Sequence, residues 1–101
     1  MEGFTVYILY SQKTNKFYKG STSNLDDRLK RHQQGREKYT KAGTPWTLIW
    51  HKNTPTKSEA IKFEYKLKNL SRKRLIQFMT KYQDGIAGPD KLLLLQQLSG
   101  C

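Results

Sequence analysis

The sequence predicts a small α+β protein, and three observations point to this class. Two apolar, aromatic segments near the N-terminus are separated by a short polar turn, which is typical of a β-hairpin. A third segment alternates aromatic and polar residues, and helical spacing of apolar residues dominates the second half of the chain. Because 101 residues support one modest hydrophobic core, we expect a domain over 1–84 with an extension over 85–101 packed on it.

The predicted hairpin joins a strand over 4–10 to a returning strand over 17–20 through a polar turn at 13–16. Side chains alternate across a strand, so the register decides which of them share a face. If the numbers of paired residues add to an odd sum, Tyr7 and Tyr18 point to the same side of the hairpin. The sequence does not fix that register.

A first helix is predicted from Leu25 to about Gln34, with Ser23 or Asn24 as its N-cap and Gly35 as its end. At about 100° per residue, two polar side chains fall on the face that also carries the leucines. The residues of this face are Leu25, Leu29, Arg28 and His32.

A third strand is predicted over 46–52 and is broken by Pro55. Ser58 is the expected N-cap of a second helix, which runs from 59 to about 69. Glu64 falls inside the apolar arc of that helix rather than on its outward face. The arc consists of Ala60, Ile61, Phe63, Leu67 and Leu70.

A third helix is expected to start at Ser71, and a last short helix is expected over 91–98. Four consecutive leucines over 92–95 make this terminal segment unusually apolar. We expect it to close the core against the third helix, and the alternative is that it pairs two copies of the chain. The expected assembly is therefore a monomer or a weak homodimer.

The charge of the chain indicates a polyanionic partner. Lys and Arg number 19 against eight Asp and Glu, which gives a formal net charge of +11. Nucleic acid is the leading candidate, and a merely soluble basic surface is the alternative. The single cysteine, Cys101, excludes a disulfide framework, and neither a signal peptide nor a membrane-spanning run is present. We expect a cytoplasmic protein without a membrane partner.

Two phenols, a guanidinium and an imidazole are candidates for phosphodiester chemistry. Tyr7 and Tyr18 can equally be strand residues that pack on a sheet. Arg28 offers a planar fork that matches phosphate oxygens, and its alternative is a salt bridge, for example with Glu64. His32 can share a proton or bind phosphate, or it can be a packing residue.

Glu64 is the candidate metal ligand. A carboxylate in an apolar arc can hold Mg²⁺, which takes oxygen ligands and often binds through one carboxylate plus substrate phosphate. The alternative is an ordinary i,i+4 ion pair with Lys68. Position on the helix does not choose between the two.

These residues carry a family resemblance. Val6-Tyr7-Ile8 and Tyr18-Lys19-Gly20 resemble the two halves of the GIY-YIG nuclease signature. The segment over 21–32 resembles the one that follows it, and the helix with Glu64 resembles the family's glutamate helix. The match extends over about 4–79 and is nearest to small stand-alone bacterial members.

The resemblance implies a three-stranded antiparallel sheet flanked by helices and a divalent-metal-dependent phosphodiesterase site that uses Mg²⁺ or Mn²⁺. It makes Tyr7 and Tyr18 the signature tyrosines, Arg28 the phosphate-binding arginine and Glu64 the metal ligand. His32 falls where the family places a further tyrosine or histidine. We expect Tyr18 to activate the attacking water and Tyr7 to position the water or the phosphate.

Three positions depart from the family pattern. Val6 replaces the first glycine, Lys19 replaces an apolar residue, and Ser21 stands where some repair members carry a lysine. Lys19 or Lys41 can compensate for that lysine. The strength of catalysis is therefore left open by the sequence.

The basic segments fit a nucleic-acid track, for which DNA is the expected substrate and RNA remains open. The candidate binding residues are Lys19, Arg31, Arg36, Lys38, Tyr39 and Lys41. A second basic patch over 62–74 is either a further track or a solvated helix face. The main alternative to a nuclease is a binding module that recognises nucleic acid without cutting it.

Overall fold

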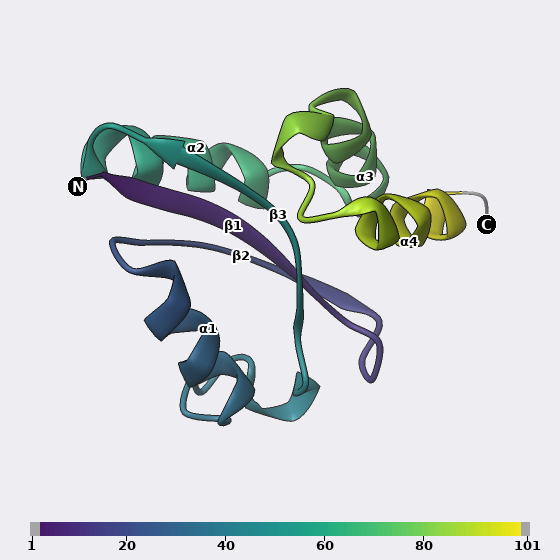
Figure 1. The fold of residues 1–101 in the computed structure, drawn as a ribbon, viewed down its shortest axis with the longest axis horizontal. Coiled ribbons are helices and arrows are strands. Elements are labelled where there is room, and N and C mark those ends of the chain that lie inside the picture. Colours follow the sequence, from purple (N-terminus) through teal and green to yellow (C-terminus); the bar gives the residue numbers. More distant parts are fainter. Residues whose placement is uncertain (1–2, 100–101) are drawn as a thin grey trace.

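The computed structural model describes residues 3–99, which form a three-stranded antiparallel sheet with helices on both faces (Figure 1). The strand order is β2-β1-β3, so β1 is the central strand and is paired on both sides. The strands are β1 Phe4–Ser11, β2 Lys16–Thr22 and β3 Thr47–Thr54. The α+β class and the three-stranded sheet predicted from the sequence are confirmed.

The register of the hairpin places both signature tyrosines on one face of the sheet. Tyr7 pairs with Gly20, and Leu9 pairs with Tyr18. These pairs have odd sums, and side chains alternate along each strand, so Tyr7 and Tyr18 point to the same side. Asn15 makes the turn with a φ of 57°, a left-handed conformation that asparagine tolerates.

Within residues 3–99, four α-helices surround the sheet, with α1 on one side and α2 and α3 on the other (Figure 1). Two short 3₁₀ turns, η1 and η2, lie in the connections. The helices are α1 Leu25–Gln33, α2 Lys57–Lys68, α3 Arg72–Lys81 and α4 Pro89–Ser99. The 3₁₀ turns are η1 Lys41–Gly43 and η2 Gln83–Gly85.

The expected start of the second helix is wrong by two residues. Thr56, rather than Ser58, is the N-cap, and its hydroxyl accepts a hydrogen bond from the Glu59 N–H at 3.1 Å. Thr56 has the extended backbone that an N-cap requires and follows directly on Pro55. Asn24 and Ser71 are the N-caps of α1 and α3.

The two faces of the sheet have separate apolar clusters. Ile8 and Trp50 belong to the larger cluster, under α2, α3 and α4, whereas Tyr7 and Trp46 belong to the smaller one beside α1. Leu95 of α4 is fully buried in the larger cluster, so the C-terminal helix closes the core as one of the two expectations had it.

Two details of the helices bear on the expectations. Ile61 was expected in the apolar arc of α2 but is half exposed, because the sheet-facing side of α2 centres on Ala60 and Leu67.

Within residues 3–99, no helix has the length and apolarity needed to cross a membrane. Cys101 lies outside the described residues.

Candidate active site

Tyr7 and His32 form a buried pair at the centre of the site. Both side chains are almost completely shielded from solvent, and Tyr7 Oη lies 3.0 Å from His32 Nε2. Gly20 makes room for this phenol, because a Cβ at that position would lie 2.7 Å from Tyr7 Oη. The glycine of the second signature tripeptide is thus required by the tyrosine of the first.

A second hydrogen bond fixes the other side of the histidine ring. His32 Nδ1 lies 2.7 Å from Thr40 Oγ1, and the Thr40 hydroxyl donates to the Glu37 carbonyl at 3.4 Å. Burial lowers the pKa of His32, so the ring is neutral at pH 7. A ring protonated on Nδ1 satisfies the whole chain, with the Tyr7 O–H donating to Nε2 and Nδ1–H donating to Thr40.

Tyr18 differs from Tyr7 in its access to solvent. Its half-buried ring packs against the His32 ring, with 5.1 Å between centroids, and the Tyr7 ring is 6.3 Å away. Within residues 3–99, the Tyr18 hydroxyl makes no hydrogen bond. Burial raises the pKa of both tyrosines, and for Tyr18 the nearby Lys68 ammonium is the main opposing influence. Both phenols are therefore protonated at neutral pH.

Arg28 reaches the same region from α1. Its side chain is 30% exposed, and its Nε lies 3.9 Å from Glu37 Oε2. The Nε atom itself is buried and has no hydrogen-bond partner among the described residues. The ion pair considered from the sequence therefore forms with Glu37 rather than with Glu64. The guanidinium charge acts on both signature tyrosines and opposes the rise in their pKa.

Glu64 is held by two neighbours on the other side of β2. The Ser21 hydroxyl donates to Glu64 Oε1 at 2.6 Å, and Lys68 Nζ lies 2.7 Å from Oε2. This hydrogen bond with Glu64 raises the pKa of Lys68. Ser21 and Tyr18 are three positions apart on β2, so their side chains point to opposite faces of the sheet. The Glu64 carboxylate therefore approaches β2 from the α2 side, and the Tyr18 phenol lies on the α1 side.

The carboxylate nevertheless acts electrostatically on the phenols. Burial is the main cause of the raised pKa of both Tyr7 and Tyr18, and the negative charge of Glu64 adds to the rise. The i,i+4 pair with Lys68, one of the two alternatives from the sequence, is present. The candidate site therefore wraps around the edge strand β2, with the aromatic part on one face and the carboxylate on the other.

The donor set fits a metal held by one protein carboxylate. Within residues 3–99, no group of three or more His, Cys, Asp or Glu side chains is placed to hold a metal ion. Mg²⁺ commonly binds through one or two carboxylates plus substrate phosphates and waters. Glu64 supplies one such carboxylate, which is the smallest number of protein ligands in that arrangement. Ser21 and Lys68 engage both Glu64 oxygens, so a cation has to compete with them.

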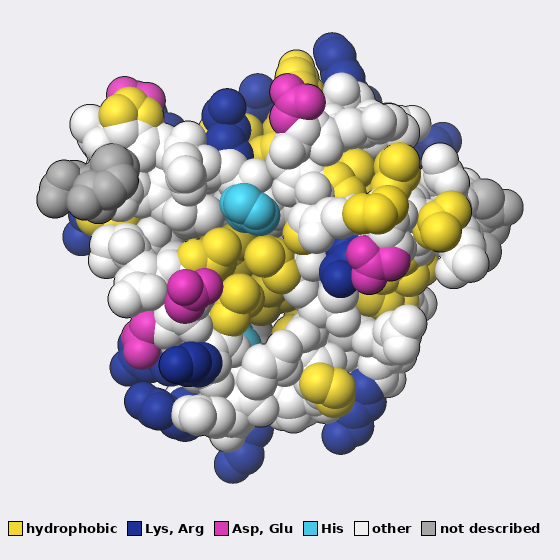
Figure 2. Space-filling view, in the orientation of Figure 1, with side chains coloured by type: hydrophobic (Ala, Val, Ile, Leu, Met, Phe, Trp, Pro, Cys, Tyr) yellow, Lys and Arg dark blue, Asp and Glu magenta, His cyan; other side chains and the backbone are white. Residues whose placement is uncertain are grey.

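Five of the candidate nucleic-acid contacts lie together, at the end of α1 and in the segment up to η1. Figure 2 shows lysine and arginine side chains gathered around α1 and the segment that follows it. Tyr39 is almost fully exposed, whereas Arg31 lies 3.7 Å from Glu37 and Arg36 donates to Gln34. The five residues are Arg31, Arg36, Lys38, Tyr39 and Lys41.

Lys19 is separated from this group. It lies on the α2 side of β2, like Ser21, and burial together with the Lys68 charge lowers its pKa. In the second basic patch, Arg72 has a structural role. Its guanidinium donates to the Asn15 carbonyl and side chain at 2.8 and 2.9 Å and lies over the Phe17 ring.

Three residues of the site were missed by reasoning from the sequence. Thr40 orients His32, Glu37 pairs with Arg28, and Ser21 holds Glu64. Thr40 and Glu37 lie in a polar loop with no periodic pattern, so no sequence signal pointed to them. Ser21 was noted only as a departure from the family pattern, although its neighbours already placed it beside the site.

Comparisons with known proteins show which family the chain resembles. The family described as GIY-YIG catalytic domain matches residues 3–82. The chain is 38% identical over 76 residues to the UPF0213 protein BH0048 of Halalkalibacterium halodurans, covering 74% of this chain and 80% of that protein. It is 37% identical over 82 residues to a UPF0213 protein of Pediococcus pentosaceus, covering 80% and 85%.

A solved structure supports the fold. The solution NMR structure of the UPF0213 protein BH0048 from Bacillus halodurans superposes with a TM-score of 0.55 at 35% identity, covering 90% of this chain and 92% of that one. The family match spans most of the chain and includes both tyrosines, Arg28, His32 and Glu64. The chain therefore belongs to the GIY-YIG family of nuclease-type domains, alongside the small UPF0213 proteins.

Proposed function

We propose that the protein is a divalent-metal-dependent endonuclease that hydrolyses phosphodiester bonds in DNA. One observation carries this proposal: among residues 3–99 the buried Arg28 Nε has no hydrogen-bond partner, with Glu37 Oε2 3.9 Å away, and the Arg28 charge acts on the half-buried Tyr18 phenol. An unpaired buried donor costs about 1–3 kcal/mol. A phosphate oxygen would satisfy this donor and would bring a phosphodiester beside the tyrosine.

Arg28 and Tyr18 are the residues that meet the substrate in this proposal. Arg28 donates to the non-bridging phosphate oxygens, where negative charge develops in the transition state. The water oxygen bonds to phosphorus as the bond to the leaving ester oxygen breaks, and the ionised form of Tyr18 takes the water proton at Oη. The leaving oxygen takes a proton from solvent. Because burial raises the pKa of Tyr18, positive charge near Oη is needed to populate this form.

Tyr7 and His32 position the reacting groups. Neither reaches solvent, so neither contacts the water or the phosphate in the described conformation. Their hydrogen bond and their ring contacts with Tyr18 fix the direction in which the Tyr18 phenol points. This role differs from the expectation that Tyr7 positions the water or the phosphate, because here it acts through Tyr18.

Glu64 is the residue that would hold Mg²⁺ or Mn²⁺. A divalent cation bound there supplies charge stabilisation for the phosphoryl and leaving oxygens. Binding requires Lys68 to release Glu64 Oε2, which leaves the ammonium free to contact a phosphate. Lys38, Tyr39 and Lys41 are exposed and extend the positive surface along the substrate.

The test is a cleavage assay on branched, flapped and single-stranded DNA, with Mg²⁺ or Mn²⁺ and with a chelator. We expect Glu64→Gln and Arg28→Ala each to lower the rate by about 10²–10³, because each removes an electrostatic stabiliser. Asp26→Asn and Lys30→Ala are the controls, since they make similar changes at exposed residues of α1. Full activity of Glu64→Gln would refute the assignment.

A second candidate function is nucleic-acid binding without cleavage. It is favoured by one observation: both Glu64 oxygens are already engaged, by Ser21 and Lys68. Salt-sensitive binding of the same DNA panel, with no cleavage under any metal condition, would support this alternative.

A further inference from the structure

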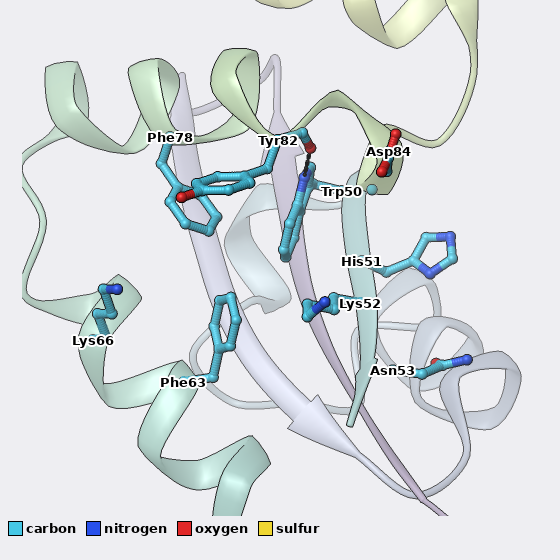
Figure 3. Close-up of a pocket in the computed structure, with 10 residues that line it drawn as sticks. Trp50, His51, Lys52, Asn53, Phe63, Lys66, Phe78, Tyr82 and Asp84 are labelled. Carbon is cyan, nitrogen blue, oxygen red and sulfur yellow. Dashed lines mark hydrogen bonds between the residues drawn. The ribbon is translucent and has the colours of Figure 1, made fainter. Parts of the chain in front are cut away.

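A pocket of about 510 Å³ lies between β3, α2 and α3 (Figure 3). Trp50 at its base pairs with Ile8, so the pocket lies on the sheet face opposite Tyr7 and Tyr18. Ligand pockets in proteins typically have volumes of about 300–1,000 Å³, which includes this one. None of its lining residues takes part in the candidate active site.

Aromatic rings form the wall of this pocket. Figure 3 shows Phe63, Phe78 and Tyr82 around the indole of Trp50. The Trp50 ring centroid lies 6.0 Å from that of Phe63 and 5.3 Å from that of Phe78, and Tyr82 lies 4.9 Å from Phe78. Trp50 is 2% exposed, whereas Tyr82 is 48% exposed and offers an open ring surface at the mouth.

Backbone contacts fix the shape of the mouth. The Trp50 Nε1–H donates to the Tyr82 carbonyl at 2.8 Å, which joins the end of α3 to β3. Gly85 lies against the same indole, and a Cβ at that position would collide with the ring. The aromatic wall is therefore built into the fold.

The rim of the pocket carries a positive excess. Lys52 of β3 and Lys66 of α2 line it, and an adjoining groove along α2 adds Lys62. The carboxylates on the same surface are Asp84 in the pocket and Glu59 in the groove. Lys52 follows Trp50 by two residues, so both side chains leave β3 on the same face.

We propose that this pocket and groove bind single-stranded nucleic acid, with a base against the aromatic wall and phosphates on the lysines. Tyr82 is the exposed ring of this wall, and an exposed aromatic ring flanked by lysines is a combination with which proteins hold unpaired bases without reading sequence. Duplex DNA keeps its bases stacked and paired, so it does not offer a base to such a wall. The site adds to the proposed nuclease site and does not depend on it.

Two indole N–H groups report separately on the two faces of the sheet. The Trp50 indole donates to Tyr82 in the pocket, and the Trp46 indole donates to Thr40 beside the active site. Titration of ¹⁵N-labelled Glu64→Gln protein with a short oligothymidylate, in a chelator, measures both resonances without cleavage. We expect the Trp50 resonance to shift with saturation, whatever the Trp46 resonance does.

Paired variants separate this site from general electrostatic attraction. Tyr82→Ala is expected to weaken the binding seen at Trp50 by about tenfold, whereas Tyr65→Ala, an exposed tyrosine of α2 outside the pocket, changes it less than twofold. Lys66→Glu is likewise expected to weaken it more than Lys73→Glu, which makes the same charge change outside the pocket.

Three outcomes would overturn the inference: an unmoved Trp50 resonance, equal losses in Lys66→Glu and Lys73→Glu, or a Trp50 shift caused by an acidic peptide but not by oligothymidylate. The last outcome would assign the pocket to a protein partner. None of these outcomes bears on cleavage, which is tested in the unsubstituted protein. A failed cleavage assay would equally leave this site standing.

Discussion

At the scale of single residues, burial divides the candidate site into two groups. Tyr7 and His32 are shielded from solvent and hydrogen-bond each other, so they hold neighbouring side chains in place rather than contact a ligand. Tyr18, Arg28 and Glu64 are partly exposed and are the groups that a phosphodiester or a cation can reach. Residue type alone does not distinguish these groups, because each contains a signature tyrosine.

The buried histidine gives a prediction for stability against pH. Burial lowers the pKa of His32 in the folded state, so the unfolded state binds more protons below the ordinary histidine pKa of about 6.5. The free energy of unfolding should fall as the pH drops from about 7 to about 5.5. Urea unfolding curves across this range measure it.

Two histidine variants provide the comparison for this prediction. His32→Gln should flatten the pH dependence of the free energy of unfolding, and the same measurement on His51→Gln, at the half-buried histidine of β3, shows what the loss of an imidazole elsewhere does. If the unsubstituted protein and His32→Gln lost stability in parallel, the buried imidazole would not be the group responsible.

The Lys68–Glu64 contact gives a prediction for metal affinity. Because Lys68 engages Glu64 Oε2 at 2.7 Å, a divalent cation competes with an ammonium for the same oxygen. Lys68 is 52% exposed, and exposed pairs contribute about 0.2–1 kcal/mol. Lys68→Met should therefore tighten Mn²⁺ binding, by about fivefold at most, in a titration followed by electron paramagnetic resonance.

Lys62→Met is the matched control for this measurement, since it removes the same charge from an exposed position of α2. Equal Mn²⁺ affinities in the two variants would mean that the change in net charge, rather than the contact with Glu64, causes the effect. Weaker Mn²⁺ binding in Lys68→Met would mean that Lys68 orients the carboxylate for the metal rather than competing with it.

At the scale of elements, α2 connects the two surfaces proposed to bind ligands. Glu64 leaves this helix toward β2, while Phe63 and Lys66 leave it toward β3 and the pocket. The rotation of α2 about its axis therefore decides both arrangements. That rotation is set by Ala60 and Leu67, which are fully buried against the sheet.

The start of α2 gives a prediction for helix capping. Thr56 Oγ1 accepts from the Glu59 N–H, so Thr56→Ala should lower the free energy of unfolding by about 1 kcal/mol. Ser58 is exposed within the first turn, and Ser58→Ala should change the free energy of unfolding by less than about 0.5 kcal/mol. A larger loss in Ser58→Ala, measured by urea unfolding, would contradict the observed cap.

At the scale of the whole molecule, the sheet separates two chemically different faces. The α1 face carries the tyrosine–histidine cluster and the basic segment after it, and the opposite face carries the aromatic pocket with its lysines. Both faces are basic at their edges, in keeping with the net charge of +11.

Much of this organisation could be predicted from the sequence because it depends on local patterns. Two apolar segments around a polar turn predicted the hairpin, whereas the register that places Tyr7 and Tyr18 on one face was supplied by the structure. Helical spacing placed Arg28 and His32 on the leucine-bearing face of α1. It placed Glu64 within the apolar arc of α2. The resemblance to GIY-YIG nucleases, confirmed by the family match over 3–82, rested on these spacings.

Contacts that cross a loop or join two elements were not predictable in this way. The partner of Arg28 is Glu37, the second partner of His32 is Thr40, and the pocket joins β3 to the end of α3. The sequence by itself determined the elements and the kinds of side chain that they carry, because periodicity and turn chemistry act over a few residues. Only the tertiary structure decided which phenol is buried and that Ser21 of β2 donates to Glu64, because burial and contacts between elements depend on segments far apart in the chain.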